Sequence, residues 1–181
     1  MNILAISGSL RKNSYNSSLL KALSQFKHEN MIINIYDELG LLPFFNADLD
    51  NHTLNEDNSP TLVKKFRQQI YNADVLIIST PEYAFEISGV LKNALDWLVS
   101  SSVIVNKPVV ILSASTSGMG GDKAHQSLTN IMDVISGRVI KKVSLQIGRI
   151  NKKINSNSEI IDEQLIMQLQ NILNKLDMYV T

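Results

Sequence analysis

Near its N-terminus the sequence gathers hydroxyl, amide and guanidinium groups between two apolar stretches. An apolar run ends at Ser7, the chain turns through Gly8, and an apolar helical pattern begins at Leu19. A phosphate monoester has three acceptor oxygens and nearly two negative charges, so its binding calls for several donors, a cation and a helix N-terminus. The loop after Gly8 offers all three and is predicted to hold a phosphate. Its candidate binding residues are Ser9, Arg11, Ser14, Asn16 and Ser17.

Two better-known phosphate loops do not match this segment. A P-loop requires G-x-x-x-x-G-K-[ST] and a dinucleotide fingerprint requires G-x-G-x-x-G, whereas Gly8 stands here without the other glycines. Asp37 and Glu38 follow the second apolar run, where a ribose-binding acid would lie, but the glycines that admit a pyrophosphate are missing. A purely structural loop of turn and N-cap residues uses the same residue types, so that alternative stays open on spacing alone.

Two later loops contain residue types that could border a flat heterocyclic ligand. Pro81, Glu82 and Tyr83 follow an apolar run, and the proline fixes the backbone so that free amides and carbonyls face a ring that Tyr83 flanks. The loop after the fourth apolar run carries Ser115 and Gly118, and its glycines let the backbone approach a ligand closely. Taken singly, both segments are also typical of ordinary loop packing and of flexible loops without a ligand.

Composition favours a small-molecule partner. The 17 basic residues balance 17 acidic ones, so no net field draws the chain to nucleic acid or to an anionic membrane. No apolar run approaches the roughly 20 residues of a membrane span, and no signal peptide is recognised. Cysteine is absent and the three histidines lack metal-ligand spacing, so we expect no metal site and a reducing, cytoplasmic location. We expect residues 1–181 to form a single domain.

Short apolar runs alternate with segments of helical period, which is the βαβ rhythm of an α/β fold. Strands are expected over residues 2–7, 31–36, 74–79, 108–113 and 138–147, and helices over 14–27, 60–72, 89–101, 122–135 and 158–178. The first, third and fourth runs are unbroken, as in central strands, whereas the second and fifth alternate apolar with polar residues, as at sheet edges. This predicts a doubly wound five-stranded parallel sheet of order 2-1-3-4-5 with helices on both faces, whose ligand crevice opens between the first and third strands.

Several stretches together resemble the NADPH-dependent FMN reductase family, flavodoxin-like proteins that include quinone, azo-dye and chromate reductases. They are Gly8-Ser9-Leu10-Arg11 with Ser14 and Asn16, Leu42-Pro43-Phe44-Phe45-Asn46, Pro81-Glu82-Tyr83 with Gly89 and residues 91–97, and Gly118 with Gly120-Gly121. The resemblance implies that the Ser9 to Ser17 residues named above bind the phosphate of FMN. It implies that Pro81, Glu82, Tyr83 and the backbone of Ala84 border the flavin ring, and that Ser115 and Gly118 approach its far edge. Family members usually carry asparagine at position 84, so Ala84 departs from the pattern.

The resemblance also implies a ping-pong reaction, in which NADPH or NADH reduces bound FMN and leaves before a small-molecule acceptor takes the electrons. The cofactor does the chemistry, so no catalytic side chain is expected. The family commonly forms homodimers or homotetramers, which implies an oligomer here, with the helix that contains Trp97 near the subunit contacts. The segment Leu42-Pro43-Phe44-Phe45 would border the substrate pocket. A flavodoxin-type FMN electron carrier without NAD(P)H activity is the alternative, although its acidic surface is absent; a receiver-like signalling domain would need clustered aspartates at the strand ends.

Overall fold

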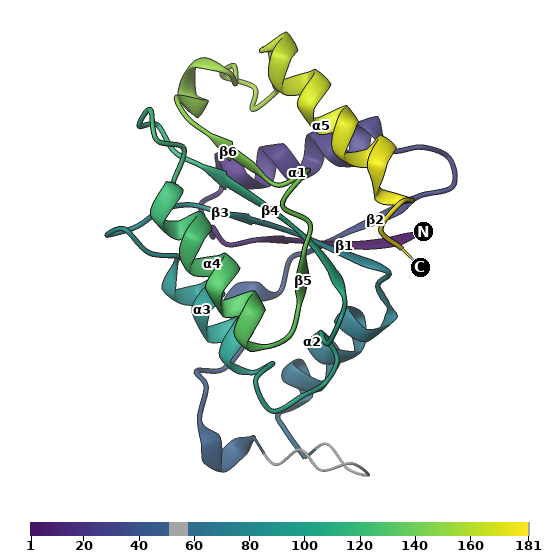
Figure 1. The fold of residues 1–181 in the computed structure, drawn as a ribbon. Coiled ribbons are helices and arrows are strands. Elements are labelled where there is room, and N and C mark those ends of the chain that lie inside the picture. Colours follow the sequence, from purple (N-terminus) through teal and green to yellow (C-terminus); the bar gives the residue numbers. More distant parts are fainter. Residues whose placement is uncertain (51–57, 181) are drawn as a thin grey trace.

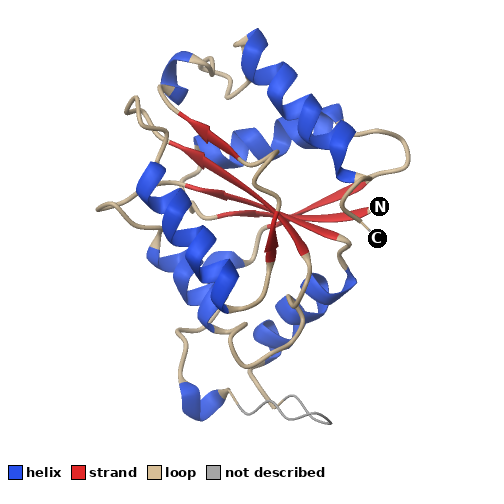
Figure 2. Ribbon diagram, in the orientation of Figure 1, coloured by secondary structure: helices blue, strands red, loops and turns tan. Residues whose placement is uncertain are grey.

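Six parallel strands form the centre of the structure, a computed structural model that describes residues 1–50 and 58–180. They lie in the order β2-β1-β3-β4-β5, and β6 pairs with β4 (Figures 1 and 2). The bounds are β1 Asn2–Ser7, β2 Ile32–Tyr36, β3 Val75–Thr80, β4 Pro108–Ala114, β5 Arg138–Val139 and β6 Leu145–Ile147. The predicted α/β class and the order 2-1-3-4-5, with the second strand at an edge, are confirmed.

The central strands are buried on both faces, as their unbroken apolar runs predict. Every residue of β3 and β4 is buried, and β1 exposes Asn2 alone. Along β1, Leu4 belongs to one hydrophobic cluster while its neighbours Ile3 and Ala5 belong to the other. This alternation follows from the two-residue period of a strand, and it gives the sheet an apolar layer on each side.

Five α-helices in the described residues cover the two faces, two on one side and three on the other. Figure 1 shows α1 and α5 against one face and α2, α3 and α4 against the other, and the two hydrophobic clusters divide in the same way. Their bounds are α1 Tyr15–Phe26, α2 Thr61–Asn72, α3 Gly89–Asp96, α4 Asp122–Val134 and α5 Glu163–Leu176. None of these helices is long and apolar enough to cross a membrane.

Two helices are shorter than their hydrophobic period predicts. The apolar pattern over residues 89–101 continues past Asp96, but the Trp97 carbonyl accepts from Arg67 Nε at 3.0 Å, and tighter turns replace the helix. The pattern over residues 158–178 begins before Asp162, whose carboxylate accepts the Leu165 N–H at 2.8 Å and caps α5. In both cases a polar contact, rather than the apolar spacing, decides where the helix ends or begins.

The predicted fifth strand, residues 138–147, is divided in the structure into β5 and β6. Ser144 Oγ accepts the Ile111 N–H at 3.0 Å and donates to the Ile140 carbonyl at 3.0 Å. The hydroxyl replaces a strand carbonyl beside β4, so the backbone of residues 140–144 can leave the sheet. Val109 pairs with Val139 whereas Leu112 pairs with Leu145, so this detour adds three residues relative to β4.

The long connection between β2 and α2 contains two short 3-10 helices, Leu39–Leu41 and Ala47–Leu49. Its second part is tied to the body of the protein by a buried ion pair, with Arg67 Nη2 2.7 Å from Asp50 Oδ1. The Arg67 guanidinium lowers the pKa of the Asp50 carboxyl, although burial alone would raise that pKa. Residues 51–57 of this connection lie outside the described residues.

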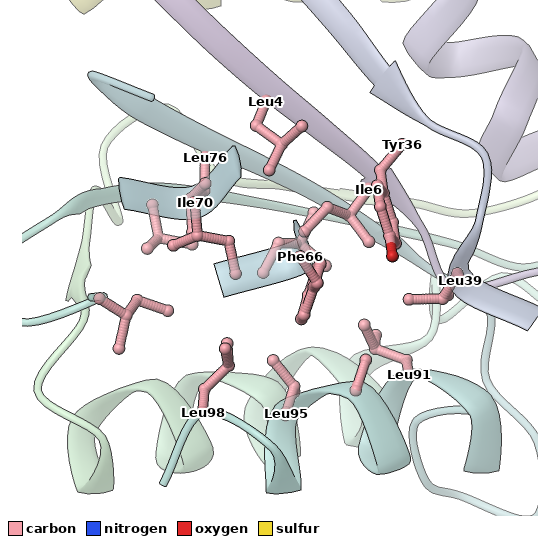
Figure 3. Packing of buried hydrophobic residues seen from close by; sticks show 14 of the residues in the cluster. Leu4, Ile6, Tyr36, Leu39, Phe66, Ile70, Leu76, Leu91, Leu95 and Leu98 are labelled. Atoms are coloured by element: carbon pink, nitrogen blue, oxygen red, sulfur yellow. The ribbon is translucent and has the colours of Figure 1, made fainter. Parts of the chain in front are cut away.

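Tyr36, the last residue of β2, lies in the cluster between the sheet and α2, α3 and α4 (Figure 3). Its ring packs against Phe66 with centroids 4.9 Å apart. Its hydroxyl is buried and has no hydrogen-bond partner within the described residues. Burial, followed by the charges of Glu38 and Asp37, raises the pKa of Tyr36 to about 12.

We expect Tyr36→Phe to leave the free energy of unfolding unchanged or to raise it, because the variant removes a buried hydroxyl that makes no bond. Ionisation of tyrosine near pH 10 in the unfolded chain precedes ionisation at the raised folded pKa of about 12. Wild-type stability is therefore fully present below pH 10 and falls between pH 10 and 12, and the variant should lack this part of the fall. Urea unfolding at pH 7 and pH 11 measures both effects. Phe66→Ala is the control and should cost about 3–5 kcal/mol; a comparable loss in Tyr36→Phe would contradict the expectation.

Candidate functional site

The candidate site lies where β1 and β3 end side by side. Ser7 pairs with Ser79 at the last register position, and the Gly8 N–H donates to the Ser79 carbonyl at 2.8 Å. Beyond this bond the two chains diverge, one into the loop before α1 and the other into residues 81–88 before α3. Between adjacent strands whose connections leave to opposite faces, a parallel sheet forms a crevice at its carboxyl edge.

The crevice holds a cavity of about 120 Å³ into which three loops contribute. The first loop, the loop after β3 and the loop after β4 each supply lining residues, so segments far apart in the sequence meet here. Most of the predicted site residues lie together in this lining. The lining consists of Ser9, Arg11, Ser14, Tyr15, Asn16, Pro81, Glu82, Tyr83, Ala114, Ser115 and Thr116.

Three predicted residues do not line the cavity: Ser17, Ala84 and Gly118. Ser17 faces the strand instead, with its hydroxyl 2.9 Å from that of Ser7, and its N–H donates to Ser14 Oγ at 3.4 Å. The latter bond makes Ser14 the N-cap of α1. Part of the loop therefore performs the capping role that its residue types also suggest.

Asn16 is buried beneath the first loop, and a neighbour holds its side-chain amide. Ser79 Oγ donates to Asn16 Oδ1 at 2.9 Å, and within residues 1–50 and 58–180 the amide nitrogen of this lining residue is left without a partner. An amide nitrogen donates two hydrogen bonds. The pairing thus favours Asn16 as a donor toward the cavity, with Ser79 as its orienting partner.

Gly118 lies in the loop after β4, close in the sequence to the lining residues Ser115 and Thr116, and this loop rests directly on the segment after β6. A Cβ built on Gly148 would lie 2.4 Å from the Gly118 carbonyl oxygen, closer than real atoms allow. The Arg149 N–H donates to the Ser117 carbonyl at 2.8 Å, and the Ile150 N–H donates to the Ser115 carbonyl at 3.1 Å. This support was not predicted from the sequence, although the isolated Gly148 after an apolar run was its signal.

Glu82 lines the cavity, but its carboxylate accepts hydrogen bonds from the backbone of α4. Oε2 accepts the N–H of Lys123 at 2.9 Å and of Ala124 at 3.0 Å, both in the first turn of α4. The carboxylate therefore acts as a cap for a helix about 40 residues further along the chain. Sequence reasoning named the residue but gave no such role to its side chain.

The loop after β3 forms a tight hairpin with an unusual turn. Tyr83 and Glu86 exchange backbone hydrogen bonds of 2.9 and 3.0 Å. Between them, Ala84 has φ 51° and Phe85 has φ 64°. Two successive positive φ values define a type I′ turn, which normally carries asparagine, aspartate or glycine because other side chains are strained there. Both turn residues are exposed.

Ser88, Ser113 and His125 support the site without having been predicted. Ser88 Oγ donates to the Gly8 carbonyl at 2.5 Å and caps α3, so it joins the first loop to the loop after β3. Ser113 Oγ donates to the Gly120 carbonyl at 2.7 Å and lies 3.1 Å from His125 Nδ1. Burial lowers the pKa of His125 and so favours its neutral imidazole. Because the Ser113 hydroxyl donates its proton to Gly120, Nδ1 is the donor to Ser113. A serine directly before a helical pattern was the signal for Ser88.

A larger hollow of about 500 Å³ lies between α3 and α4, away from the strand ends. Apolar side chains, among them Leu95, Val99, Ile131 and Val134, make up much of its wall. It has no set of converging hydroxyl donors like the first cavity, so it does not suit a phosphate. Within residues 1–50 and 58–180, no group of three or more histidine or acidic side chains could hold a metal ion.

The sequence model of the NADPH-dependent FMN reductase family matches residues 1–152. The chain belongs to this family. It is 30% identical to a quinone reductase of Escherichia coli over 166 residues, 90% of this chain and 86% of that one. It is 31% identical to an NAD(P)H-dependent FMN reductase of Pseudomonas aeruginosa, across 99% of this chain and 95% of that one.

A solved structure has the same fold. The flavoenzyme NAD(P)H:(acceptor) oxidoreductase FerB from Paracoccus denitrificans superposes with a TM-score of 0.84, at 23% identity, over 99% of this chain and 96% of that one. The flavodoxin-like architecture predicted from the sequence is therefore confirmed, and so is the family to which the resemblance pointed.

We expect Ala84→Asn to stabilise the protein by about 0.5–1 kcal/mol, because asparagine tolerates the left-handed conformation better than alanine. Chemical denaturation of the two proteins measures the difference. Ala47→Asn is the matched control, since Ala47 lies exposed in a right-handed 3-10 helix and should show no gain. A loss of stability in Ala84→Asn would show that the turn is not strained at this position.

Proposed function

We propose that this chain is an FMN-dependent NAD(P)H oxidoreductase that works by a ping-pong mechanism. Electrons would pass from NAD(P)H through bound FMN to a quinone, an azo compound, a metal oxyanion or a free flavin. The observation that carries the proposal is the cavity at the β1 and β3 strand ends, which gathers phosphate donors and a ring-bordering loop in a member of an FMN reductase family. Relatives are named quinone reductase and NAD(P)H-dependent FMN reductase.

The lining of the cavity fits a phosphate group. Ser9 and Ser14 are buried hydroxyls, Asn16 has a free amide nitrogen, and Arg11 brings a positive charge. The cavity also lies at the start of α1, where the first N–H groups have no partner within the helix and favour an anion. We propose that Ser9, Arg11, Ser14 and Asn16 contact the phosphate, and that Ser17 holds the loop from behind.

The other lining residues fit the flat end of the cofactor. At about 120 Å³ the cavity is smaller than the roughly 300–1,000 Å³ of most ligand pockets, so it suits the phosphate end rather than a whole cofactor. Pro81, Tyr83 and Ser115 stand on two facing loops beside it, and we propose that they border the ring. Ala84 and Gly118 would contribute through their backbone and through the shape of these loops.

The protein's part in the reaction is binding and positioning. When bound, FMN would supply the redox chemistry between NAD(P)H and the acceptor, so no side chain has to serve as a nucleophile. Arg11 would offset the phosphate charge, and Pro81 would hold the backbone before the hairpin rigid. Tyr83 is half exposed at the rim, where a nicotinamide or an acceptor ring would meet it.

We further propose that residues 1–181 form one cytoplasmic FMN-binding domain that assembles as a homodimer or homotetramer. The two hydrophobic clusters share one sheet, which supports a single domain. Exposed Val99, Val134 and Phe85 along the hollow between α3 and α4 support a contact with another subunit there. The segment with Phe44 lies beside α3, where Asn93 Nδ2 donates to the Pro43 carbonyl at 3.0 Å, and we propose that it borders the acceptor's pocket.

Arg11→Ala should weaken FMN binding by about 1.5–3 kcal/mol, or roughly 10- to 150-fold, because it removes a charge-assisted contact to the phosphate. Quenching of FMN fluorescence on titration with apoprotein gives Kd. Riboflavin binding should not change, since riboflavin has no phosphate. Lys12→Ala removes a neighbouring exposed cation that does not line the cavity and serves as the control. Equal losses in the two variants would point to a general charge effect and against a phosphate site at Arg11.

Anaerobic mixing with NADPH or NADH should bleach the yellow colour of the FMN-loaded protein, and a quinone should then restore it. Stopped-flow absorbance follows both half-reactions separately, which a ping-pong mechanism requires. The alternative, a flavodoxin-type carrier, predicts no bleaching by either nucleotide and reduction only by an added reductase. A colourless protein that takes up no FMN would refute the cofactor assignment itself.

A further inference from the structure

Helix α4 begins without a capping side chain of its own. Its N-cap residue is Gly121, in a left-handed conformation with φ 74°. A Cβ on Gly121 would lie 3.4 Å from Ser113 Cβ and 3.5 Å from Glu82 Cβ, so the start of this helix is packed against the end of β4 and the loop after β3. The first N–H groups of a helix need partners from outside it, and here they must come from a different loop.

The Glu82 carboxylate provides these partners. One oxygen, Oε2, accepts both the Lys123 and the Ala124 N–H at 2.9 and 3.0 Å. Hydrogen bonds to an ionised acceptor are stronger than neutral ones, and a negative charge at a helix N-terminus is favourable. This cap is therefore a firm link between two loops that are distant in the sequence.

The link joins the two walls of the cavity. Glu82 stands between Pro81 and Tyr83, on the wall after β3, while α4 continues directly from residues 115–121, the wall after β4. A second contact, from Ser127 Oγ to Glu86 Oε2 at 2.5 Å, ties the other end of the hairpin to the next turn of α4. The hairpin is thus attached to α4 near both of its ends, through Glu82 and Glu86.

We propose that Glu82 is a positioning residue that sets the separation of the two loops bordering the flavin ring; this rests on the function proposed above. Both contacts of its carboxylate are made by backbone N–H groups of α4, so it acts on the ring through the loops that it joins. Loss of the link lets the hairpin shift relative to residues 115–121. Such a shift weakens contacts to the ring while the phosphate contacts on the first loop remain.

Comparison of FMN with riboflavin separates this role from a general stabilising cap. The test measures Kd for both ligands in Glu82→Gln, which keeps the side chain's size and removes its charge. We expect FMN and riboflavin each to bind about tenfold more weakly, since small displacements of positioning groups have effects of this order or larger. The ratio of the riboflavin Kd to the FMN Kd should stay that of the wild type. Arg11→Ala should instead lower the ratio of the riboflavin Kd to the FMN Kd, because it weakens the binding of FMN and leaves that of riboflavin unchanged.

The matched control is Asp162→Asn, which makes the same kind of change at the cap of α5, on the other face of the sheet (Figure 1). It should lower the unfolding midpoint and leave both Kd values unchanged. Glu82→Asp, which keeps the charge but is one methylene shorter, is the second variant and should be measured if the glutamine variant folds poorly. Circular dichroism establishes that each variant is folded before binding is measured.

Two results would overturn the proposal. If Glu82→Gln or Glu82→Asp lowers the unfolding midpoint but binds both ligands as the wild type does, Glu82 is a structural cap only. If FMN binding falls and riboflavin binding does not, Glu82 acts at the phosphate end. Failure of the proposed function looks different, because the wild-type protein itself would then bind neither ligand.

Discussion

The hydrogen bond from the Gly8 N–H to the Ser79 carbonyl extends the pairing of β1 and β3 by one residue, and the rest of the site depends on it. It fixes the starts of two loops side by side at the edge of the sheet, before one loop leads to α1 and the other to α3 on opposite faces. Ser88 then bonds the Gly8 carbonyl, and Ser79 bonds Asn16. A Cβ on Gly8 would meet Leu91 Cδ2 at 3.1 Å and Pro81 Cδ at 3.3 Å, so close packing favours glycine here.

The sequence predicted what local patterns determine. Unbroken apolar runs identified the buried strands and their order, and polar residues after those runs identified most of the cavity lining, because parallel strands bring their carboxyl ends to one edge. It did not predict features that depend on distant partners. The division of the last strand follows from a bond between Ser144 and Ile111, and the capping role of Glu82 follows from a helix whose own start is a glycine. The end of α3 likewise depends on Arg67, from another helix.

The hairpin after β3 combines strain with restraint. Ala84 and Phe85 occupy a turn that disfavours them, yet the hairpin is held by the Glu82 and Glu86 contacts to α4. Strained backbone persists where the surrounding contacts determine it, and such places are frequent at functional sites. These contacts explain how the chain accommodates alanine at a left-handed turn position. The contacts of Glu82 and Glu86 with α4, rather than the turn residues Ala84 and Phe85, therefore hold the hairpin in its shape.

The detour of residues 140–144 has a consequence for which insertions and deletions the chain can accept. Val139 packs with the cluster under α2, α3 and α4, whereas Leu145 and Ile147 pack with the cluster under α1 and α5. In an uninterrupted strand all three would face the same way, since their numbers differ by even steps. The three additional residues reverse that parity. Because residues 140–144 lie outside the sheet, a change of length there falls in the detour and leaves the pairing of β6 with β4 as it is, whereas an insertion of one residue within β6 itself would turn the following inward-facing side chains toward the wrong layer.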